Sequence, residues 1–336
     1  MKKRILAVLI ATALAVSVTG CAGNATSSSD STSASSVAES SDTSTQTSSE
    51  DESKDESSQE ESKDLEANYT KYTLDGDLTQ HMIDMSRLNE GNKVRLANVI
   101  KKLKNGEEVT VGFIGGSITQ GTSAGNDLCY AKLTADWLQK TYSNAKINYV
   151  NAGIGATGSY IGVHRVANDL LSKNPDLVFV EFSVNDTTEN TERNKKSYDG
   201  LLRTIWKSST NPAIITIATT QEDGTSFQDQ HAEIVKHYDL PMISYRNTIL
   251  DTIKHGDIVW KDISDDNIHP NVPGHKIVSQ LLQAYISDVD KDVDNISGSE
   301  SDFTTPATDA PIENGSLIQP SSTTIRIWEE FYSFSN

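Results

Sequence analysis

Five short apolar segments, each followed by a segment with helical spacing, constrain the fold of this chain more than any other feature. The apolar segments are rich in β-branched residues and lie at 109–114, 147–151, 177–182, 213–218 and 242–245. Helices are predicted over 78–103 (which Gly91 would divide into two), 130–142, 161–171, 195–206, 227–238 and 273–289. Apolar strands that alternate with helices typically form a parallel sheet covered on both faces. The pattern therefore predicts an α/β domain with five parallel strands.

The two ends of the chain differ in composition from this body. Residues 1–21 start with three basic residues, continue with an apolar run that is too short to span a bilayer comfortably, and end at Cys21. Residues 22–68 are dominated by Ser, Thr and acidic residues without an apolar run, which predicts a disordered tether. The globular domain is predicted over 69–292. Residues 293–336 are predicted to be a linker and a short β-prone extension, either an edge strand of this domain or the start of a further module.

The charge and the cysteine content exclude several classes of protein. The net charge of −18 makes the chain a poor candidate for binding nucleic acid. Cys21 and Cys129 are its two cysteines, so that no disulfide framework is predicted. Cys129 lies in an apolar helical pattern and is predicted to be a core residue rather than a nucleophile. The sequence contains no HExxH pattern and no Cys/His cluster, so neither a metal nor a cofactor is predicted.

The first apolar segment runs directly into Gly115, Gly116 and Ser117. A strand that breaks at two glycines places the next hydroxyl in a sharp, exposed turn, which is what nucleophilic catalysis requires. The structural alternative is that Ser117 caps a helix, because serine is favoured at that position. The two roles are compatible.

The second apolar segment ends in a glycine-rich turn that contains Gly153, Gly155 and Gly158. These glycines are either ordinary turn residues or allow a backbone N–H to approach a developing oxyanion. Their spacing matches GxGxxG, but a dinucleotide site needs that motif after the first strand and an acid about twenty residues later. Asp169 is nearer than that, which argues against a dinucleotide.

Polar residues also follow the third segment and precede the last helix. Asn185 and Asp186 end the third segment, where they either form a turn or offer an amide to an oxyanion. Asp266 and His269 share one short loop, in which the carboxylate can orient the imidazole. Asp265 and His275 are their rivals, and the pair His255 and Asp257 shows how easily such spacing arises by chance.

Taken together and in this order, these four blocks resemble those of the SGNH hydrolases, also called GDSL-type esterases. The matching stretches are GGSIT, NAGIGATG, SVND and DDNIHP, across about residues 109–285. The resemblance implies Ser117 as nucleophile, His269 as base and acid, and Asp266 as orienting carboxylate. It also implies an oxyanion hole from the Ser117 N–H, the Gly155 N–H (with Gly153 as the fallback) and the Asn185 amide. The predicted fold is a three-layer α/β/α sandwich with a five-stranded parallel, flavodoxin-like sheet.

The sequence departs from the family pattern at two positions. Gly116 replaces the aspartate that precedes the serine, and Ser183 replaces a glycine two residues before Asn185. Neither change removes a group that transfers protons. The first is expected to alter the rigidity of the turn and the second to narrow the pocket, so both bear on specificity.

The run Val18-Thr19-Gly20-Cys21 resembles the lipobox of bacterial lipoproteins. That resemblance implies cleavage before Cys21, lipid attachment to its sulfur, and export to the outer face of the bacterial cell membrane, with membrane contact through the anchor alone. The alternative is an ordinary secretory signal that is cut nearby.

These features predict an extracellular serine esterase that works through an acyl-enzyme and removes acetyl groups from carbohydrate. Two alternatives stay open. One is a lipase or lysophospholipase. The other is a non-catalytic lipoprotein that binds a solute or a carbohydrate, including an inactive descendant of the esterase.

Overall fold

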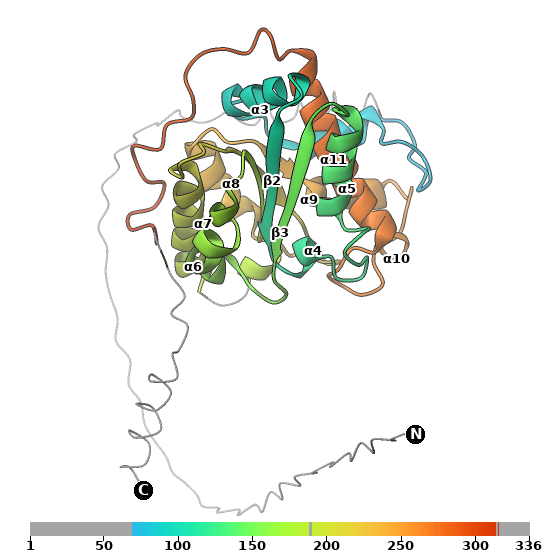
Figure 1. The fold of residues 1–336 in the computed structure, drawn as a ribbon. Helices are drawn as coiled ribbons and strands as arrows, with labels where there is room; N and C mark the ends of the chain where they lie inside the picture. Colours follow the sequence, from blue (N-terminus) through green and yellow to red (C-terminus); the bar gives the residue numbers. More distant parts are fainter. Residues whose placement is uncertain (1–68, 188–189, 314, 316–336) are drawn as a thin grey trace, which may run out of the picture. The chain divides into compact units, whose positions relative to one another are not determined.

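The apolar segments form a single sheet in the computed structural model, which describes residues 69–187, 190–313 and 315 (Figure 1). The described part of the chain contains six strands: β1 (Arg87–Asn89), β2 (Glu108–Gly115), β3 (Lys146–Gly153), β4 (Leu177–Glu181), β5 (Ala213–Ala218) and β6 (Met242–Ser244). The predicted signal segment, the predicted lipidation site at Cys21 and the predicted tether lie outside the described residues, as does most of the predicted extension.

The strand order is β1-β6-β5-β4-β2-β3, and the contacts among β2 to β6 are all parallel. Numbered along the chain, these five strands have the order 2-1-3-4-5, which is the flavodoxin-like order. The predicted parallel sheet is confirmed. Its order reverses between β2 and β4, where Phe113 pairs with Phe179 in register. Ligand sites in such sheets lie beyond the carboxyl ends of the strands at this point.

A sixth strand extends the five that the sequence pattern predicts. The segment predicted as one helix or two over 78–103 forms α2 (Gln80–Ser86), then β1, then α3 (Val94–Lys104). β1 pairs antiparallel with β6. The division occurs at Gly91, where φ is +61° and a Cβ atom would lie 2.2 Å from the backbone nitrogen of Pro241. Only glycine fits such a close approach in the left-handed region.

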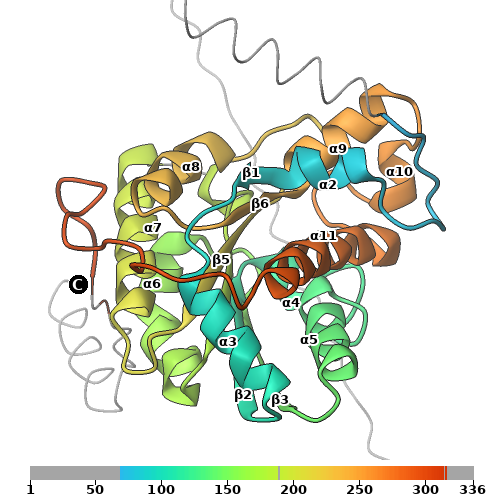
Figure 2. The same ribbon diagram turned by 90° about the horizontal axis from the view of Figure 1, so that it is seen from above.

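Helices cover both faces of the sheet (Figures 1 and 2). Apolar residues of one face, among them Val109, Val111 and Phe113, pack with the helices α3, α5 (Tyr130–Thr141), α9 (Tyr245–Lys254) and α11 (Val272–Lys291). The opposite face, which includes Ile114 and Val180, packs with α6 (Ser159–Asp169), α7 (Thr191–Trp206) and α8 (Gln228–His237). Shorter elements complete the described chain: α4 (Ser117–Gln120), η1 (Leu171–Lys173), η2 (Asn185–Thr187) and α10 (Trp260–Ile263). The three-layer α/β/α arrangement follows from this division.

Residues 293–313 continue along the body after α11. Phe303 is buried and stacks on Tyr238 and Trp206, with ring centroids 3.9 and 4.5 Å apart. The Ile312 N–H donates to the carbonyl of Lys196 in α7 at 3.0 Å. The domain boundary at residue 292 stays a prediction, but the first part of the segment after it is packed against the same core.

Two further features bear on the chemistry of the described residues. Cys129 is a free thiol, fully buried at the start of α5, as the interpretation of a core residue requires. None of the helices in the described ranges has the length and apolar character needed to cross a bilayer.

Candidate active site

Ser117 is the first residue of α4, the short helix that follows β2. The chain leaves β2 at Gly115, turns at Gly116 and presents the Ser117 side chain at the carboxyl edge of the sheet. In Figure 1 this edge is the one beside α4. The predicted strand–glycine–serine turn therefore places the hydroxyl where ligand sites of this fold occur.

The structure brings Ser117, His269 and Asp266 into one hydrogen-bonded array. His269 Nε2 lies 2.9 Å from Ser117 Oγ, and His269 Nδ1 lies 2.8 Å from Asp266 Oδ2. Ser117 and His269 are 152 residues apart in sequence. The order of groups, hydroxyl to imidazole to carboxylate, is that of a catalytic triad.

The protonation of the array follows from the surroundings of Asp266. Partial burial alone would raise the pKa of this carboxyl, but hydrogen bonds from the backbone and ring of His269 and the backbone of Ile268 outweigh burial and lower the pKa to about 2. An ionised carboxylate is only an acceptor, so His269 Nδ1 must donate to it. In the neutral ring Nε2 is then left to accept the proton of the Ser117 hydroxyl.

The loop that carries Asp266 and His269 is tied down on its inner side. Ser264 Oγ lies 2.8 Å from the Asp266 carbonyl and 2.6 Å from the His269 carbonyl. Trp260 Nε1–H donates to the Asp266 carbonyl at 2.6 Å, and Ser264 forms a β-bridge with Pro270. These contacts hold the backbone on both sides of the pair, so the imidazole is positioned by a rigid loop.

Asn185 follows β4 and lies beside the serine turn. A Cβ atom at Gly116 would lie 2.0 Å from Asn185 Oδ1 and 3.3 Å from the Thr157 carbonyl. No side chain fits between them, which explains why an aspartate cannot stand at position 116 in this packing. The departure from the family pattern therefore accompanies a close fit of the Asn185 amide against the nucleophile turn.

Gly155 follows β3 on the other side of the serine. A Cβ atom at Gly155 would lie 3.9 Å from Ser117 Cβ, so its backbone borders the hydroxyl. Its N–H donates to Gln120 Oε1 at 2.9 Å. The N–H of Gly153 donates instead to Asn151 Oδ1 at 2.8 Å, which makes Gly155 the better-placed donor of the two. Gln120 is a contact that the sequence pattern does not predict.

A buried arginine donates hydrogen bonds to the backbone directly before both turns. Arg165 in α6 is 1% exposed, and its guanidinium donates to the carbonyl of Gly115 at 2.9 Å and to that of Ala152 at 2.5 Å. These carbonyls belong to the ends of β2 and β3, directly before the Ser117 and Gly155 turns. The sequence offers one signal, the spacing of Arg165 and Asp169, which form an ion pair one helical turn apart at 3.2 Å.

Glu181, the last residue of β4, is a second buried charge-bearing group below the site. Thr219 Oγ1 donates to Glu181 Oε1 at 2.7 Å, and Thr119 Oγ1 donates to Oε2 at 3.3 Å. Full burial raises the pKa of Glu181 to about 7, although these hydrogen bonds oppose the shift. Thr119 belongs to α4, so this acid links the nucleophile helix to the end of β5.

The remaining candidate residues from the sequence lie outside the array and make structural contacts. His275 is fully buried in α11, where its Nδ1 accepts the Tyr130 N–H at 3.1 Å and burial lowers its pKa to about 4. Asp265 is exposed, and its carbonyl accepts Lys261 Nζ at 3.2 Å. The Ser183 hydroxyl is buried and accepts the Thr219 N–H at 2.7 Å, so it faces β5 rather than the pocket that it was expected to narrow.

Asp186, next to Asn185, faces the core. Its Oδ1 accepts the Ser159 N–H at 2.8 Å, and its Oδ2 lies 2.9 Å from His231 Nε2. Both members of this second Asp–His pair are buried, with side chains 1% and 0% exposed. The His231 ring stacks on Tyr198 at 3.6 Å. The pair fixes the start of α6 and the η2 turn that carries Asn185.

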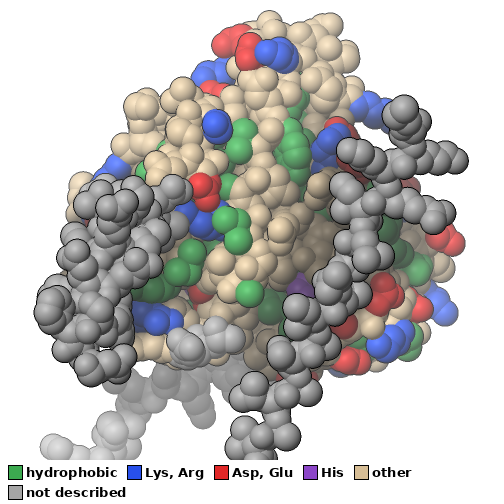
Figure 3. All heavy atoms as spheres, turned by 60° about the horizontal axis from the view of Figure 1, so that its bottom comes forward, with side chains coloured by type: hydrophobic (Ala, Val, Ile, Leu, Met, Phe, Trp, Pro, Cys, Tyr) green, Lys and Arg blue, Asp and Glu red, His purple; other side chains and the backbone are tan. Residues whose placement is uncertain are grey.

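A cavity of about 380 Å³ adjoins Asn185. Its lining includes the ring of Tyr160 and the guanidinium of Arg193, which lies 4.6 Å from the Tyr160 ring centre, together with Asn194. Figure 3 looks towards this edge of the molecule, where a histidine side chain is visible in a hollow. The cavity beside Asn185 therefore has aromatic, cationic and amide groups in its lining.

The family follows from comparison with known sequences. Residues 113–277, which contain every member of the array and all three candidate oxyanion donors, match the model of the GDSL-like Lipase/Acylhydrolase family. These residues belong to that family. The fold is that of a GDSL-type hydrolase, a family of serine esterases. No curated protein matches the chain at a significant level.

Solved structures show the same fold with related chemistry. A two-domain esterase active on acetylated mannans, co-crystallised with mannopentaose, is 37% identical, with a TM-score of 0.66 over 71% of this chain and 64% of that one. A second structure of a two-domain esterase active on acetylated mannans is 38% identical, with a TM-score of 0.64 over 67% of this chain and 61% of that one. The chain thus spans less than two thirds of the length of these esterases.

Proposed function

We propose that this chain is an exported serine esterase that removes acetyl groups from polysaccharides. The observation that carries the proposal is the array in which Ser117 Oγ, His269 and Asp266 follow each other at 2.9 and 2.8 Å. The similarity to an esterase active on acetylated mannans supports the choice of an acetylated carbohydrate.

The proposed reaction uses each member of the array in turn. Ser117 Oγ attacks the acetyl carbon while His269 Nε2 takes the hydroxyl proton, and the proton then passes to the sugar oxygen as the ester bond breaks. Water attacks the resulting acetyl-enzyme by the same route, which releases acetate and restores the serine. Asp266 stays ionised because its pKa is about 2, and it stabilises the imidazolium in both steps.

The negative charge on the acetyl oxygen needs preorganised donors. The proposed donors are the Ser117 N–H, the Gly155 N–H and the Asn185 side-chain amide. A Cβ atom at Gly155 would lie 3.9 Å from Ser117 Cβ, which supports the place of Gly155 in this set. The Gly155 N–H is held by Gln120 Oε1 at 2.9 Å, so the substrate oxygen takes the place of the Gln120 amide oxygen when it enters. That exchange keeps the donor oriented before substrate arrives.

The cavity beside Asn185 favours binding of a sugar over binding of a long acyl chain. The Tyr160 ring offers a flat surface for a sugar ring, and Arg193 and Asn194 make the same cavity lining polar. Charged and amide groups on this wall disfavour a long acyl chain, because their desolvation is costly.

The deciding experiment compares substrates. We expect the purified chain to release acetate from acetylated mannan or acetylated xylan and to hydrolyse p-nitrophenyl acetate. Esters of long-chain acids should be poor substrates. A clear preference for the long-chain esters would support the lipase alternative, and absence of fluorophosphonate labelling at Ser117 in a folded sample would support a non-catalytic binding protein.

The anchored location is part of the proposal and is supported by the lipobox resemblance at Cys21. Two acyl chains anchor a protein stably, whereas a single chain is marginal. In a bacterial host, the chain should incorporate labelled palmitate and partition with membranes, and Cys21→Ser should abolish both. Release of the unmodified protein into the medium by the wild type would instead indicate an ordinary secretory signal.

A further inference from the structure

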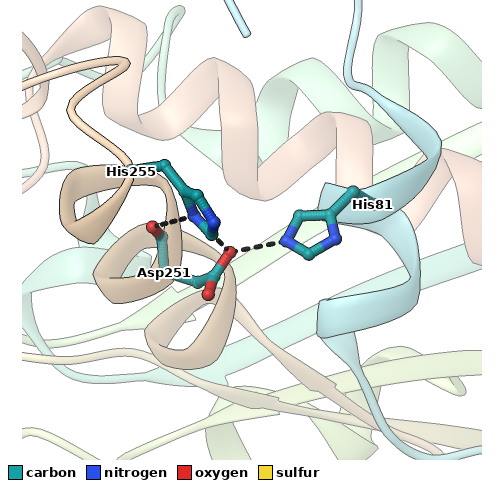
Figure 4. Close-up of side chains that lie close together, drawn as sticks. All are labelled: His81, Asp251 and His255. Carbon is teal, nitrogen blue, oxygen red and sulfur yellow. Dashed lines mark hydrogen bonds and ion pairs between the residues drawn. The ribbon is translucent and has the colours of Figure 1, made fainter. Parts of the chain in front are cut away.

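A second cluster of chemistry-bearing side chains joins α2 to α9. His81 belongs to α2 and Asp251 to α9, whereas His255 is the residue directly after α9, one turn beyond Asp251 (Figure 4). His81 Nε2 lies 2.6 Å from Asp251 Oδ2, and His255 Nδ1 lies 3.2 Å from the same oxygen. One ligand atom from each residue falls within a set whose members are all within 4.8 Å of one another. Two imidazoles therefore converge on one carboxylate oxygen.

The cluster is largely shielded from solvent. The side chains of His81, Asp251 and His255 are 4%, 12% and 17% exposed. The ring of Tyr69 stacks on His255 with centroids 4.2 Å apart and covers it from outside. The Tyr69 hydroxyl in turn donates to Asp257 Oδ1 at 2.5 Å. Asp257, which the sequence spacing pairs with His255, therefore binds the covering tyrosine instead.

We infer that His81, Asp251 and His255 bind one transition-metal ion, of which Zn²⁺ is the best fit. Two neutral imidazole nitrogens and one carboxylate oxygen suit zinc and its neighbours, whereas Ca²⁺ and Mg²⁺ favour sets made of oxygen. Three protein ligands are enough to hold zinc in sites where the fourth ligand is not a protein side chain. No zinc motif is visible in the sequence because the ligands come from two helices that are 170 residues apart.

The two contacts with Asp251 lie close to the spacing that the ion requires. Zinc–ligand bonds of about 2.0–2.1 Å place tetrahedral ligand atoms about 3.3 Å apart. The contact between His255 Nδ1 and Asp251 Oδ2, at 3.2 Å, already has this spacing. The His81 contact, at 2.6 Å, must open by about 0.7 Å, which a rotation of the side chain supplies. His255 Nδ1 also gives up its contact with the Asp251 carbonyl, at 3.0 Å.

The charge around the cluster favours a cation. The carboxylate of Asp251 contacts both imidazoles, and Asp257 adds a second carboxylate that accepts the hydroxyl of Tyr69. The chain as a whole carries a net charge of −18, which raises the local concentration of cations. Because the ligands come from two helices, the ion would fasten α2 to α9 and so act on stability rather than on ester hydrolysis.

The test uses the full chain, stripped of metal with EDTA and then titrated with Zn²⁺ by calorimetry and with Co²⁺ by visible absorption. We expect one ion per chain, the intense visible bands of tetrahedral Co²⁺, and a rise in melting temperature of at least about 3 °C with excess Zn²⁺. EDTA should leave turnover of p-nitrophenyl acetate unchanged. Asp251→Asn and His81→Gln should each weaken Zn²⁺ binding by at least about 100-fold.

His237→Gln is the matched control, because His237 is an exposed histidine of α8 outside the cluster. Its affinity for Zn²⁺ should equal that of the wild type. If a variant does not fold, Zn²⁺ should still protect His255, but not His237, from diethyl pyrocarbonate in the wild type. The inference is overturned if the wild type binds no ion near 1:1 stoichiometry, if folded Asp251→Asn and His81→Gln bind as tightly as it does, or if Zn²⁺ leaves His255 unprotected. The cluster is then a hydrogen-bonded tie between the two helices.

Discussion

Two aspartate–histidine pairs have nearly equal contact distances but different surroundings, which separate their roles. The Asp266–His269 contact is 2.8 Å and the Asp186–His231 contact is 2.9 Å. In the first pair the side chains are 47% and 21% exposed, and the far ring nitrogen meets the Ser117 hydroxyl. In the second they are 1% and 0% exposed, and the ring stacks on Tyr198. The pair alone therefore does not define a catalytic group. The exposure and the partner of the far nitrogen do.

The same substitution in both pairs gives the strongest test of this difference. His269→Phe removes the proton acceptor for Ser117, so turnover of p-nitrophenyl acetate should fall by at least about 10⁴-fold while the melting temperature stays near the wild-type value. Ser117→Ala should have an effect of similar size, and the double variant should be no worse than either single one, because the residues act as a unit. Additive losses in the double variant would contradict the shared role.

Asn185 and Asp186 are neighbours that face opposite sides of the turn, which sharpens the comparison. Asn185→Ala should lower kcat by about 10²–10³-fold with little change in KM, because an oxyanion donor acts mainly in the transition state. Asn185→Asp retains the shape but replaces the donor with an acceptor, and it should lose at least as much. Steady-state kinetics on p-nitrophenyl acetate measure both. Wild-type kcat in the alanine variant would exclude Asn185 from the oxyanion hole.

His231→Phe is the equivalent substitution in the buried pair. The new ring retains the stack on Tyr198, but Asp186 loses a partner inside the core, so the free energy of unfolding should fall by about 3 kcal/mol. Turnover per folded molecule should fall by less than about tenfold. Denaturant unfolding and fluorophosphonate titration of active sites measure these quantities. A loss of turnover equal to that of His269→Phe would erase the distinction between the pairs.

Glu181 is a further buried group, and it is expected to make the stability of the protein depend on pH. Its folded pKa of about 7 lies above the ordinary value of 4.5, so its contribution to stability is fully present below about pH 4.5 and is lost as the pH rises to 7. Glu181→Gln should remove this dependence, and the stability difference between variant and wild type should grow by about 3 kcal/mol in favour of the variant between pH 4.5 and pH 8. The exposed Glu107→Gln is the control and should show no such trend in denaturant unfolding.

Tyr160 tests the open side of the site, with the smallest expected effect. Tyr160→Ala should raise KM for acetylated manno-oligosaccharides by about tenfold, because the ring surface for the sugar is lost. The kinetics of p-nitrophenyl acetate, which has no sugar, should stay unchanged, and Tyr160→Phe should behave like the wild type. An equal loss on both substrates would indicate that Tyr160 supports the site structurally.

The sequence predicts the parts of the fold that have strong local patterns. The five parallel strands carry continuous apolar runs, and their order follows from the crossover rules together with the family resemblance. β1 is missed because its three residues, Arg87–Asn89, have no apolar alternation and pair only with β6. The sequence predicts that Gly91 divides the helix expected from residue 78. The reason for a glycine there, its close approach to Pro241, is visible only in the structure.

The candidate site divides in the same way. Ser117, Asp266 and His269 lie in short motifs, so the sequence could name them, and the structure brings them together. Gln120 and Arg165 could not be named, because a charged or amide residue in a helix is ordinarily at the surface. Their roles depend on carbonyl and N–H groups of other segments, which tertiary packing alone brings near.

The Arg165 guanidinium donates to the last carbonyl of β2 and to the carbonyl one residue before the end of β3, so one side chain holds two turns from separate segments. Substitutions in the surrounding loops can therefore change which substrates bind. They leave the distance between Ser117 Oγ and the Gly155 N–H unchanged. In a mutagenesis screen for new substrates, we expect position 165 to tolerate almost no replacement, while the outer wall around the cavity accepts many. The buried guanidinium of Arg165 thus allows substrate specificity to change while the reaction stays the same.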